Sequence, residues 1–513
     1  MIIRRLAGEV RSLHALEVPL PAGSRLFSDR RAHICLLAGM ALLILFSKLH
    51  QGDLAGYDSA VYAYEGRQML QTGEWGTVYL NGRPDFDKPP LFVWMEAVSM
   101  ALFGATDFAA RFPAALLGWG TLLLVALLAR ELSDSYWLPV WAMLVLLTTH
   151  AFMRFGMHAM TDMPFSFFFV LAIFCAVRAE RDRRWMLGCG LAVCAAIMTR
   201  SFLGLIPLGV VVGHLATSGR LALLRSKEAL LGLALALGLP AAWFLSQYRI
   251  FGEDFLARHF SFTYDNLPLT NGKRPERFAA GLLEYPRLLL TTYWPWLPLM
   301  VLGLATQLRK RLWDREAAAG LLPLWVAGVL LPFSFAEFKW LRYILPAFPA
   351  FAILAAIPLD AWLGPRRRER TLLAAYALLL LAMAGMGLNP KYRDRPEELR
   401  RLAPLAAAAT PAGEKVLLQT DRNPRDAHLF QLIWYANREC ELVEGPSELL
   451  ARLQQRPTAV IADKAGFEAL LRRNPAARPG IRVLGETEHF ICWTGAAPAL
   501  QATAPQGGPN DKL

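Results

Sequence analysis

The sequence predicts a polytopic α-helical membrane protein that carries a small C-terminal α/β domain outside the membrane. Of the 513 residues, 55% are hydrophobic, and the mean hydropathy of +0.32 is higher than that of ordinary soluble domains. Long apolar runs recur up to about residue 388, and beyond it short β-like runs alternate with amphipathic ones. These observations define the fold class before any motif is considered.

Each apolar run is a candidate membrane span, because a spanning helix needs about 20 mostly apolar residues. We predict about 11–13 transmembrane helices in the region 33–388. The candidate spans are 33–49, 112–132, 136–153, 163–179, 186–200, 203–217, 229–249, 293–308, 319–335, 342–360 and 371–388. A further apolar segment, 91–106, is ambiguous.

The positions of the basic residues predict the orientation. The formal net charge is +12, and the basic residues gather between apolar runs, which indicates membrane orientation rather than nucleic-acid binding. Basic residues before the first span place the N-terminal segment 1–32 in the cytoplasm. Four later clusters, around 178–184, 220–227, 309–315 and 366–370, fall on the same side only if 91–106 makes no net crossing.

We therefore predict that 91–106 lies along the membrane interface or re-enters, unless another crossing lies nearby. The loop 50–111, the loop 250–292 and the C-terminal region then share the outer side.

The region 389–497 is predicted to form the outer α/β domain. Its expected strands are 416–418, 458–461 and 489–493, and its expected helices are 426–436, 446–455 and 464–473. Cys440 and Cys492 lie in this domain and are either bonded to each other or free. The Ala-, Pro-, Gly- and Gln-rich residues 498–513 are predicted to be a disordered tail.

The outer loops carry more charge than simple connections need, and charge beside a bilayer usually has a task. Carboxylates serve as general bases, cationic side chains hold phosphates, and a carboxylate with a histidine can hold a divalent cation. We expect that side chains from separate outer segments can build one cavity: Asp58, Glu65, Arg67, Asp85, Asp87, Lys88, Asp162, Arg200, His259, Lys339, Arg342 and Tyr343.

Several of these residues also have simpler interpretations. Asp162 precedes Met163-Pro164 and can be the N-cap of the next helix. Lys88 can be an interfacial lysine that extends toward water, and Lys339 and Arg342 can be interfacial anchors. His259 taken alone is more typical of a surface histidine. Asp58, which follows the first span, is the hardest to explain in this way.

Short motifs follow one another in a fixed order over residues 30–350. They include Gly56-Tyr57-Asp58-Ser59, Asp87-Lys88-Pro89-Pro90, Thr161-Asp162-Met163-Pro164, Met198-Thr199-Arg200, His259-Phe260 and Tyr343-Ile344-Leu345-Pro346. No single piece is specific, but the ordered set resembles the lipid-linked-sugar glycosyltransferases of the ArnT-like and protein O-mannosyltransferase superfamily, of the glycosyltransferase family 39/83 type. Those enzymes have the GT-C fold.

The resemblance implies that a sugar moves, with inversion, from a polyprenyl-phosphate donor of the undecaprenyl-phosphate type. The acceptor would be a lipid such as lipid A, a protein or a glycan on the periplasmic face of a bacterial inner membrane. By position, Asp58 and Asp162 would be catalytic. The residues that would bind the donor phosphate are Lys88, Arg200, Lys339, Arg342 and Tyr343, and a divalent metal, the one cofactor suggested, would lie at Asp87 and His259.

The chain departs from the family pattern at three of these places. Ser59 follows Asp58 where the family often has a glutamate, Arg200 stands where a lysine is common, and Asp87 stands where ArnT-like members have a glutamate. Two other classes remain open from the residues alone. One is a transporter or lipid flippase, and the other is a membrane-anchored sensor or scaffold that works through the C-terminal domain.

Overall fold

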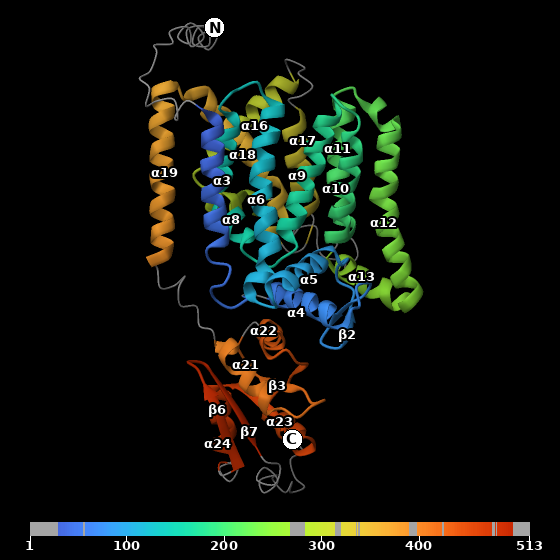
Figure 1. Ribbon diagram of the computed structural model, residues 1–513, viewed down its shortest axis with the longest axis vertical. Coiled ribbons are helices and arrows are strands. Elements are labelled where there is room, and N and C mark those ends of the chain that lie inside the picture. The colour runs from blue at the N-terminus through green and yellow to red at the C-terminus, as the bar shows by residue number, and fades with distance from the viewer. Residues whose placement is uncertain are drawn as a thin grey trace, which may run out of the picture.

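The computed structural model has two parts, a bundle of helices and a smaller sheet-containing domain beyond one end of it (Figure 1). It describes residues 29–54, 57–266, 283–312, 320–334, 336, 339–388, 398–422, 425–473, 478 and 480–495. Most of the predicted N-terminal segment and the predicted tail 498–513 lie outside these residues.

The bundle helices follow the order of the predicted spans. They are α3 (Arg30–Phe46), α6 (Asp107–Leu132), α7 (Leu138–Leu147), α8 (His150–Gly156), α9 (Asp162–Ala179), α10 (Trp185–Arg200), α11 (Ile206–Thr217), α12 (Lys227–Phe251), α16 (Leu297–Leu312), α17 (Leu321–Ser334), α18 (Phe348–Trp362) and α19 (Pro365–Leu388). Within the described residues, five helical stretches are long and apolar enough to cross a membrane. The count becomes six if α7 and α8, bent by 70°, form one span. The protein is therefore a multi-pass membrane protein.

The longest of these stretches folds back on itself. Ser201 has a φ of 54°, and a Cβ added at Gly204 would lie 2.2 Å from a backbone nitrogen of α10. At the far end of α11, His214 Nε2 lies 2.9 Å from Oε1 of Glu180, which precedes α10. The two helices thus form an antiparallel hairpin joined by the short η3 (Ser201–Leu205), with Arg200 at its tip.

The bundle interior is packed closely enough to require glycine where helix backbones meet. A Cβ at Gly303 of α16 would lie 1.9 Å from the carbonyl oxygen of Leu354 in α18. All ten residues of α7 are buried. Apolar packing of this density makes the bundle a rigid framework.

A layer of shorter elements lies across one end of the bundle, where the sequence analysis expected a loop. It contains α4 (Tyr57–Thr72), the hairpin of β1 (Val78–Leu80) and β2 (Arg83–Asp85), and α5 (Leu91–Phe103). In Figure 1, α4 and α5 run across the bundle end rather than through it. This is the arrangement expected for the ambiguous apolar segment. We call these elements, with α13 (Glu253–Asn266), the end layer.

The C-terminal domain is built on a five-stranded sheet in the order β4-β3-β5-β7-β6. Strands β4 (Cys440–Leu442), β3 (Val416–Gln419) and β5 (Ala459–Asp463) are parallel, whereas β7 (Phe490–Gly495) and β6 (Ile481–Glu486) add in antiparallel fashion. Its helices are α21 (Glu398–Ala409), α22 (Arg425–Ala436), α23 (Pro446–Gln455) and α24 (Lys464–Arg473), and α22 packs on α4. The expected strands and helices are present, and α21, β4 and β6 are additional.

Cys440 and Cys492 are buried and both are free. They lie on β4 and β7, which are separated in the sheet by β3 and β5. Of the two alternatives left open by the sequence, the structure therefore has the free thiols.

Candidate active site

The first element of the site is an ion pair between Asp58 and Arg342. Asp58 lies in the first turn of α4, where the partial positive charge of a helix N-terminus favours a carboxylate. Arg342 lies in η6 (Leu341–Ala347), which leads into α18, and its Nη1 donates to Asp58 Oδ2. The two residues are 284 positions apart, so only the folded chain brings them together.

The second element is an ion pair between Asp162 and Arg200. Arg200 Nη1 lies 2.6 Å from Asp162 Oδ1, and the two side chains are only 8% and 2% exposed. The N-cap of α9 is Thr161, and its side chain makes no capping hydrogen bond. The N-cap interpretation of Asp162 was therefore wrong. Its carboxylate lies inside the first helical turn and pairs with the guanidinium at the tip of the α10–α11 hairpin.

Tyr343 connects the two ion pairs. The guanidinium carbons of Arg200 and Arg342 lie 5.7 Å and 5.8 Å from the centre of its ring. The ring itself stacks on Phe333 of α17, with the ring centres 5.6 Å apart. Two carboxylates, two guanidinium groups and one phenol thus form a continuous cluster at the end of the bundle.

Lys88 extends this cluster from the end layer. Its ammonium group donates a hydrogen bond to the Tyr62 hydroxyl of α4 instead of extending toward water, as the interfacial interpretation would require. Burial lowers the pKa of Lys88, but the neighbouring Tyr62, Asp58 and Asp87 raise it by more, so the net pKa is above its usual value. Lys88 is therefore a cation at neutral pH.

His259 of α13 holds two parts of the site together. It is 5% exposed, so the surface interpretation was wrong. Its Nδ1 lies 2.5 Å from the carbonyl oxygen of Phe86, and its Nε2 lies 2.8 Å from Ser201 Oγ. Phe86 is two residues before Lys88, and Ser201 follows Arg200, so the histidine joins the segments that carry both cations.

The metal predicted at Asp87 and His259 lacks a complete ligand set in the described part of the chain. No group of three or more His, Cys, Asp or Glu side chains there could hold a metal ion. Both ring nitrogens of His259 already have protein partners. The described residues do not complete a metal site, so a metal at Asp87 and His259 stays a prediction.

Lys339 is the site residue that the structure leaves apart. Its Nζ donates to the carbonyl oxygen of Ala336, 2.7 Å away, within its own turn. This contact fits an anchor of the η6 turn. A role for Lys339 at the donor phosphate stays a prediction.

Three further groups lie beside Lys88: the buried Tyr62 and Glu65 and the half-buried Asp85. The sequence analysis placed Glu65 and Asp85 among the outer charges without a specific role and did not single out Tyr62. Tyr62, Glu65 and Asp85 line one narrow cavity together with Asp87, Lys88 and Thr161. Burial, reinforced by the charge of Asp85, raises the pKa of Glu65 well above its usual value. Asp58, Tyr62 and Glu65 have the i, i+4, i+7 spacing of one helix face. A helix predicted over 57–72 would therefore have placed these three side chains together.

Comparison with known proteins finds relatives with similar sequences and similar folds. Residues 87–244 match the family described as dolichyl-phosphate-mannose-protein mannosyltransferase. The undecaprenyl phosphate-alpha-4-amino-4-deoxy-L-arabinose arabinosyl transferase of Pectobacterium carotovorum is 31% identical over 379 residues, which are 69% of this chain and 66% of that protein. In sequence this chain is thus similar to ArnT-like glycosyltransferases.

Solved structures with a similar fold match nearly the whole of this chain. ArnT from Cupriavidus metallidurans bound to undecaprenyl phosphate has a TM-score of 0.73 at 19% identity, and the match covers 93% of this chain and 100% of that one. The Archaeoglobus fulgidus oligosaccharyltransferase has a TM-score of 0.54 at 12% identity, covering 86% and 70%. At these identities the structures establish the fold. The match to the Pectobacterium relative spans just under two thirds of that relative's length.

Proposed function

We propose that this ArnT-like chain is an inverting glycosyltransferase that takes its sugar from a polyprenyl-phosphate donor of the undecaprenyl-phosphate type. The observation that carries the proposal is the convergence of Asp58, Lys88, Asp162, Arg200 and Arg342 at one end of an apolar bundle. A polyprenyl tail must stay in lipid while its phosphate and sugar reach water, and a charged site at the end of membrane helices meets both demands.

The cations suit a phosphate leaving group. When the bond between the sugar and the donor phosphate breaks, negative charge grows on the phosphate oxygens. Lys88, Arg200 and Arg342 can stabilise that charge in a partly buried site, where fixed cations act more strongly than in water. The bound undecaprenyl phosphate of the Cupriavidus structure supports a donor of this kind.

The carboxylates suit the acceptor. An acceptor oxygen attacks the sugar carbon from the side opposite the phosphate, and direct displacement of this kind inverts the configuration. Asp58 orients the acceptor and takes its proton. A donor phosphate can replace Asp58 as the partner of Arg342, which leaves the carboxylate for the acceptor. Asp162 holds Arg200 in place through the buried ion pair.

The acceptor class and the location extend the proposal. The acceptor is a lipid such as lipid A, a protein or a glycan. The basic clusters at 178–184, 220–227, 309–315 and 366–370 support a cytoplasmic location for the opposite ends of the helices. The site and the C-terminal domain then face the periplasm from a bacterial inner membrane.

The test uses the purified full-length protein in lipid nanodiscs with a panel of undecaprenyl-phosphate sugars, and measures the release of undecaprenyl phosphate. Wild-type protein should turn over one of them, and D58N and K88A should each lose about 10²–10³-fold. The matched control is E131Q, because Glu131 also pairs with arginines, Arg178 and Arg181, each at 2.7 Å. Full turnover by D58N, or transport of an intact donor without release, would contradict the proposal.

A further inference from the structure

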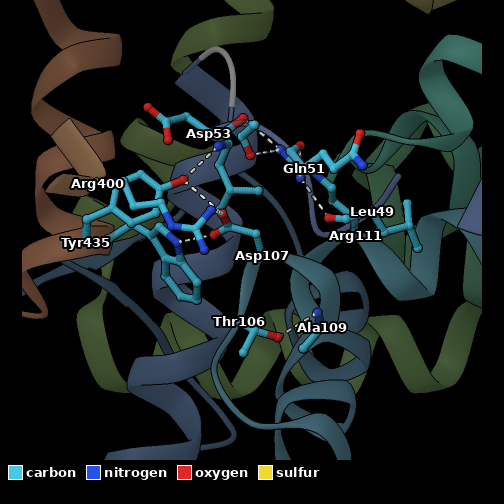
Figure 2. Close-up of polar contacts among 12 residues, drawn as sticks. Leu49, Gln51, Asp53, Thr106, Asp107, Ala109, Arg111, Arg400 and Tyr435 are labelled. Atoms are coloured by element: carbon cyan, nitrogen blue, oxygen red, sulfur yellow. Dashed lines mark hydrogen bonds and ion pairs between the residues drawn. The ribbon is translucent and has the colours of Figure 1, made fainter. Parts of the chain in front are cut away.

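The chain that enters α4 is held along its backbone by one arginine. Arg111 of α6 is buried, and its guanidinium donates hydrogen bonds to four backbone carbonyl groups within residues 49–53 (Figure 2). Nη1 lies 2.7 Å from the oxygen of Leu49 and 3.1 Å from that of Gln51. Nη2 lies 3.1 Å from the oxygen of Gly52 and 2.7 Å from that of Asp53. The segment from 49 to 53 therefore has a defined path rather than that of a free loop.

The next residue is held by the C-terminal domain instead. The backbone N–H of Leu54 donates to the hydroxyl of Tyr435, 2.9 Å away, and its carbonyl oxygen accepts from Gln431 Nε2 at 3.0 Å. Both side chains belong to α22. The ring of Phe430, on the same helix, meets that of Tyr57 edge-on with the centres 4.6 Å apart.

Asp107 fixes α22 against α6. Its buried carboxylate accepts from Trp434 Nε1 at 2.9 Å and from the Tyr435 hydroxyl at 3.2 Å, and Arg400 Nη1 lies 3.5 Å from it. Figure 2 shows Asp107 near both Tyr435 and Arg400. Asp107 is one helical turn before Arg111. The Tyr435 hydroxyl thus makes two hydrogen bonds at once, one to the membrane domain's helix and one to the segment before α4.

The segment so held leads directly to the candidate catalytic aspartate. Asp58 lies in the first turn of α4 and follows Leu54 closely in the chain. Lys88 and Arg200 reach the site from other segments and pair there with Tyr62 and Asp162. A change at the Tyr435 hydroxyl should therefore move Asp58 and leave Arg200, which Asp162 of α9 holds, in place.

We propose that the C-terminal domain positions the active site through Tyr435, which acts on Asp58 by holding Leu54. The inference rests on the proposed function. Tyr435 is a positioning residue: its hydroxyl reaches the backbone at 54, and α4 carries the constraint to the carboxylate. A displacement of about 1 Å in a reacting group can cost about 100-fold in rate, so a small loosening of this segment is measurable.

The test compares two Tyr→Phe variants of the full-length protein. Y435F removes the hydroxyl that bonds Leu54 and Asp107. Y376F is the matched control, because the Tyr376 hydroxyl also has a buried partner, His33 Nδ1 at 2.6 Å, but in another part of the bundle. We expect Y435F to lower kcat at least tenfold with the donor KM unchanged, and Y376F to leave both unchanged.

Hydrogen exchange measures the same segment without turnover. In Y435F, and in Q431A as a second variant, peptides that contain Leu54 should exchange faster than in wild type, while Y376F should match wild type there. Faster exchange together with a fall in kcat at constant donor KM supports the proposal, and any other combination overturns it. If wild type transfers no sugar, the proposed function fails, and the exchange result still decides whether Tyr435 holds the segment.

Discussion

The bundle interior and the end layer are built on opposite principles. The interior is made of aromatic and aliphatic side chains, of which Trp141, Phe169, Trp325 and Phe351 are almost completely buried. The end layer and the adjoining helix ends bury ionisable groups instead, namely Glu65, Arg67, Glu96, Asp162, Arg200 and His259. Burying charge is costly unless it is paired, so the second region depends on the rigidity of the first. The apolar framework and the charged site are therefore separated along the bundle axis.

The largest expected effect comes from breaking a buried ion pair in the charged region. R200Q removes the cation at the hairpin tip and leaves Asp162 buried without its partner. We expect the rate of undecaprenyl phosphate release to fall by about 10²–10³-fold, because a fixed positive charge at the donor phosphate is lost. The measurement is a single-turnover assay with the donor that wild type uses.

The matched change is R178Q, since Arg178 pairs with Glu131 at the opposite end of the helices. It should retain wild-type turnover. If R178Q and R200Q lose activity equally, the functional division between the two ends of the bundle is wrong.

A smaller effect is expected from crowding the framework. G303A places a methyl group against the carbonyl oxygen of Leu354, 1.9 Å from the Cβ position, so α16 and α18 must separate. Overpacking of this kind typically costs about 1–3 kcal/mol. We expect a lower melting temperature in detergent, with unchanged kcat for the molecules that remain folded.

The control for this change is G39A in α3, where an added Cβ meets nothing within 4 Å. Its melting temperature should equal that of wild type or exceed it slightly, because alanine favours the helix. A loss of kcat in folded G303A would show that the framework also tunes the chemistry.

A third change tests a buried acid in the end layer. Glu96 of α5 is fully buried, and neither carboxylate oxygen has a hydrogen-bond partner among the described residues. Burial raises its pKa well above the usual value. The folded state then binds a proton that the unfolded state releases above about pH 4.5, so this group makes the protein less stable as the pH rises.

We therefore expect E96Q to raise the melting temperature by about 1–3 °C at pH 7, and the difference to shrink toward pH 4.5. Thermal unfolding followed across this pH range in the same detergent provides the measurement. An E96Q protein that is less stable than wild type at pH 7 would mean that the carboxylate is ionised and paired.

The smallest effect is expected from metal removal. Both nitrogens of His259 bond to the protein, so chelation and metal-free preparation should leave turnover unchanged. A loss of turnover that is reversed by adding a divalent cation would support the metal site predicted at Asp87 and His259. The end layer would then bind a metal in addition to its charged side chains.

Several residues of the candidate site could be predicted from the sequence, because each stands out from its immediate neighbours in the chain. Asp58, Lys88, Asp162 and Arg200 are charges beside apolar runs, and the ordered motifs resemble one enzyme superfamily. The pairings could not be predicted. Arg342 was expected near the phosphate but not as the partner of Asp58, since contact across 284 positions leaves no local pattern.

Elements with weak local signals were missed as well. Residues 59–67 of α4 are all buried, polar and charged ones included, so the helix has no apolar stripe by which its sequence could predict it. Strand β4 has three residues, too few for alternation to be recognised, and β6 is the partly exposed strand at the opposite edge of its sheet. In each case neighbours in the folded chain stabilise what local propensity does not.

By itself, the sequence determined that this is a multi-pass membrane protein. The length of each apolar run and the distribution of basic residues are local properties, and they control membrane insertion and orientation. It also indicated that charged residues gather at the ends of the apolar runs. Only the tertiary structure decided how those charges pair and that α22 holds the backbone before Asp58. Such contacts join distant segments, and their geometry exists only once the bundle, the end layer and the C-terminal domain have packed together.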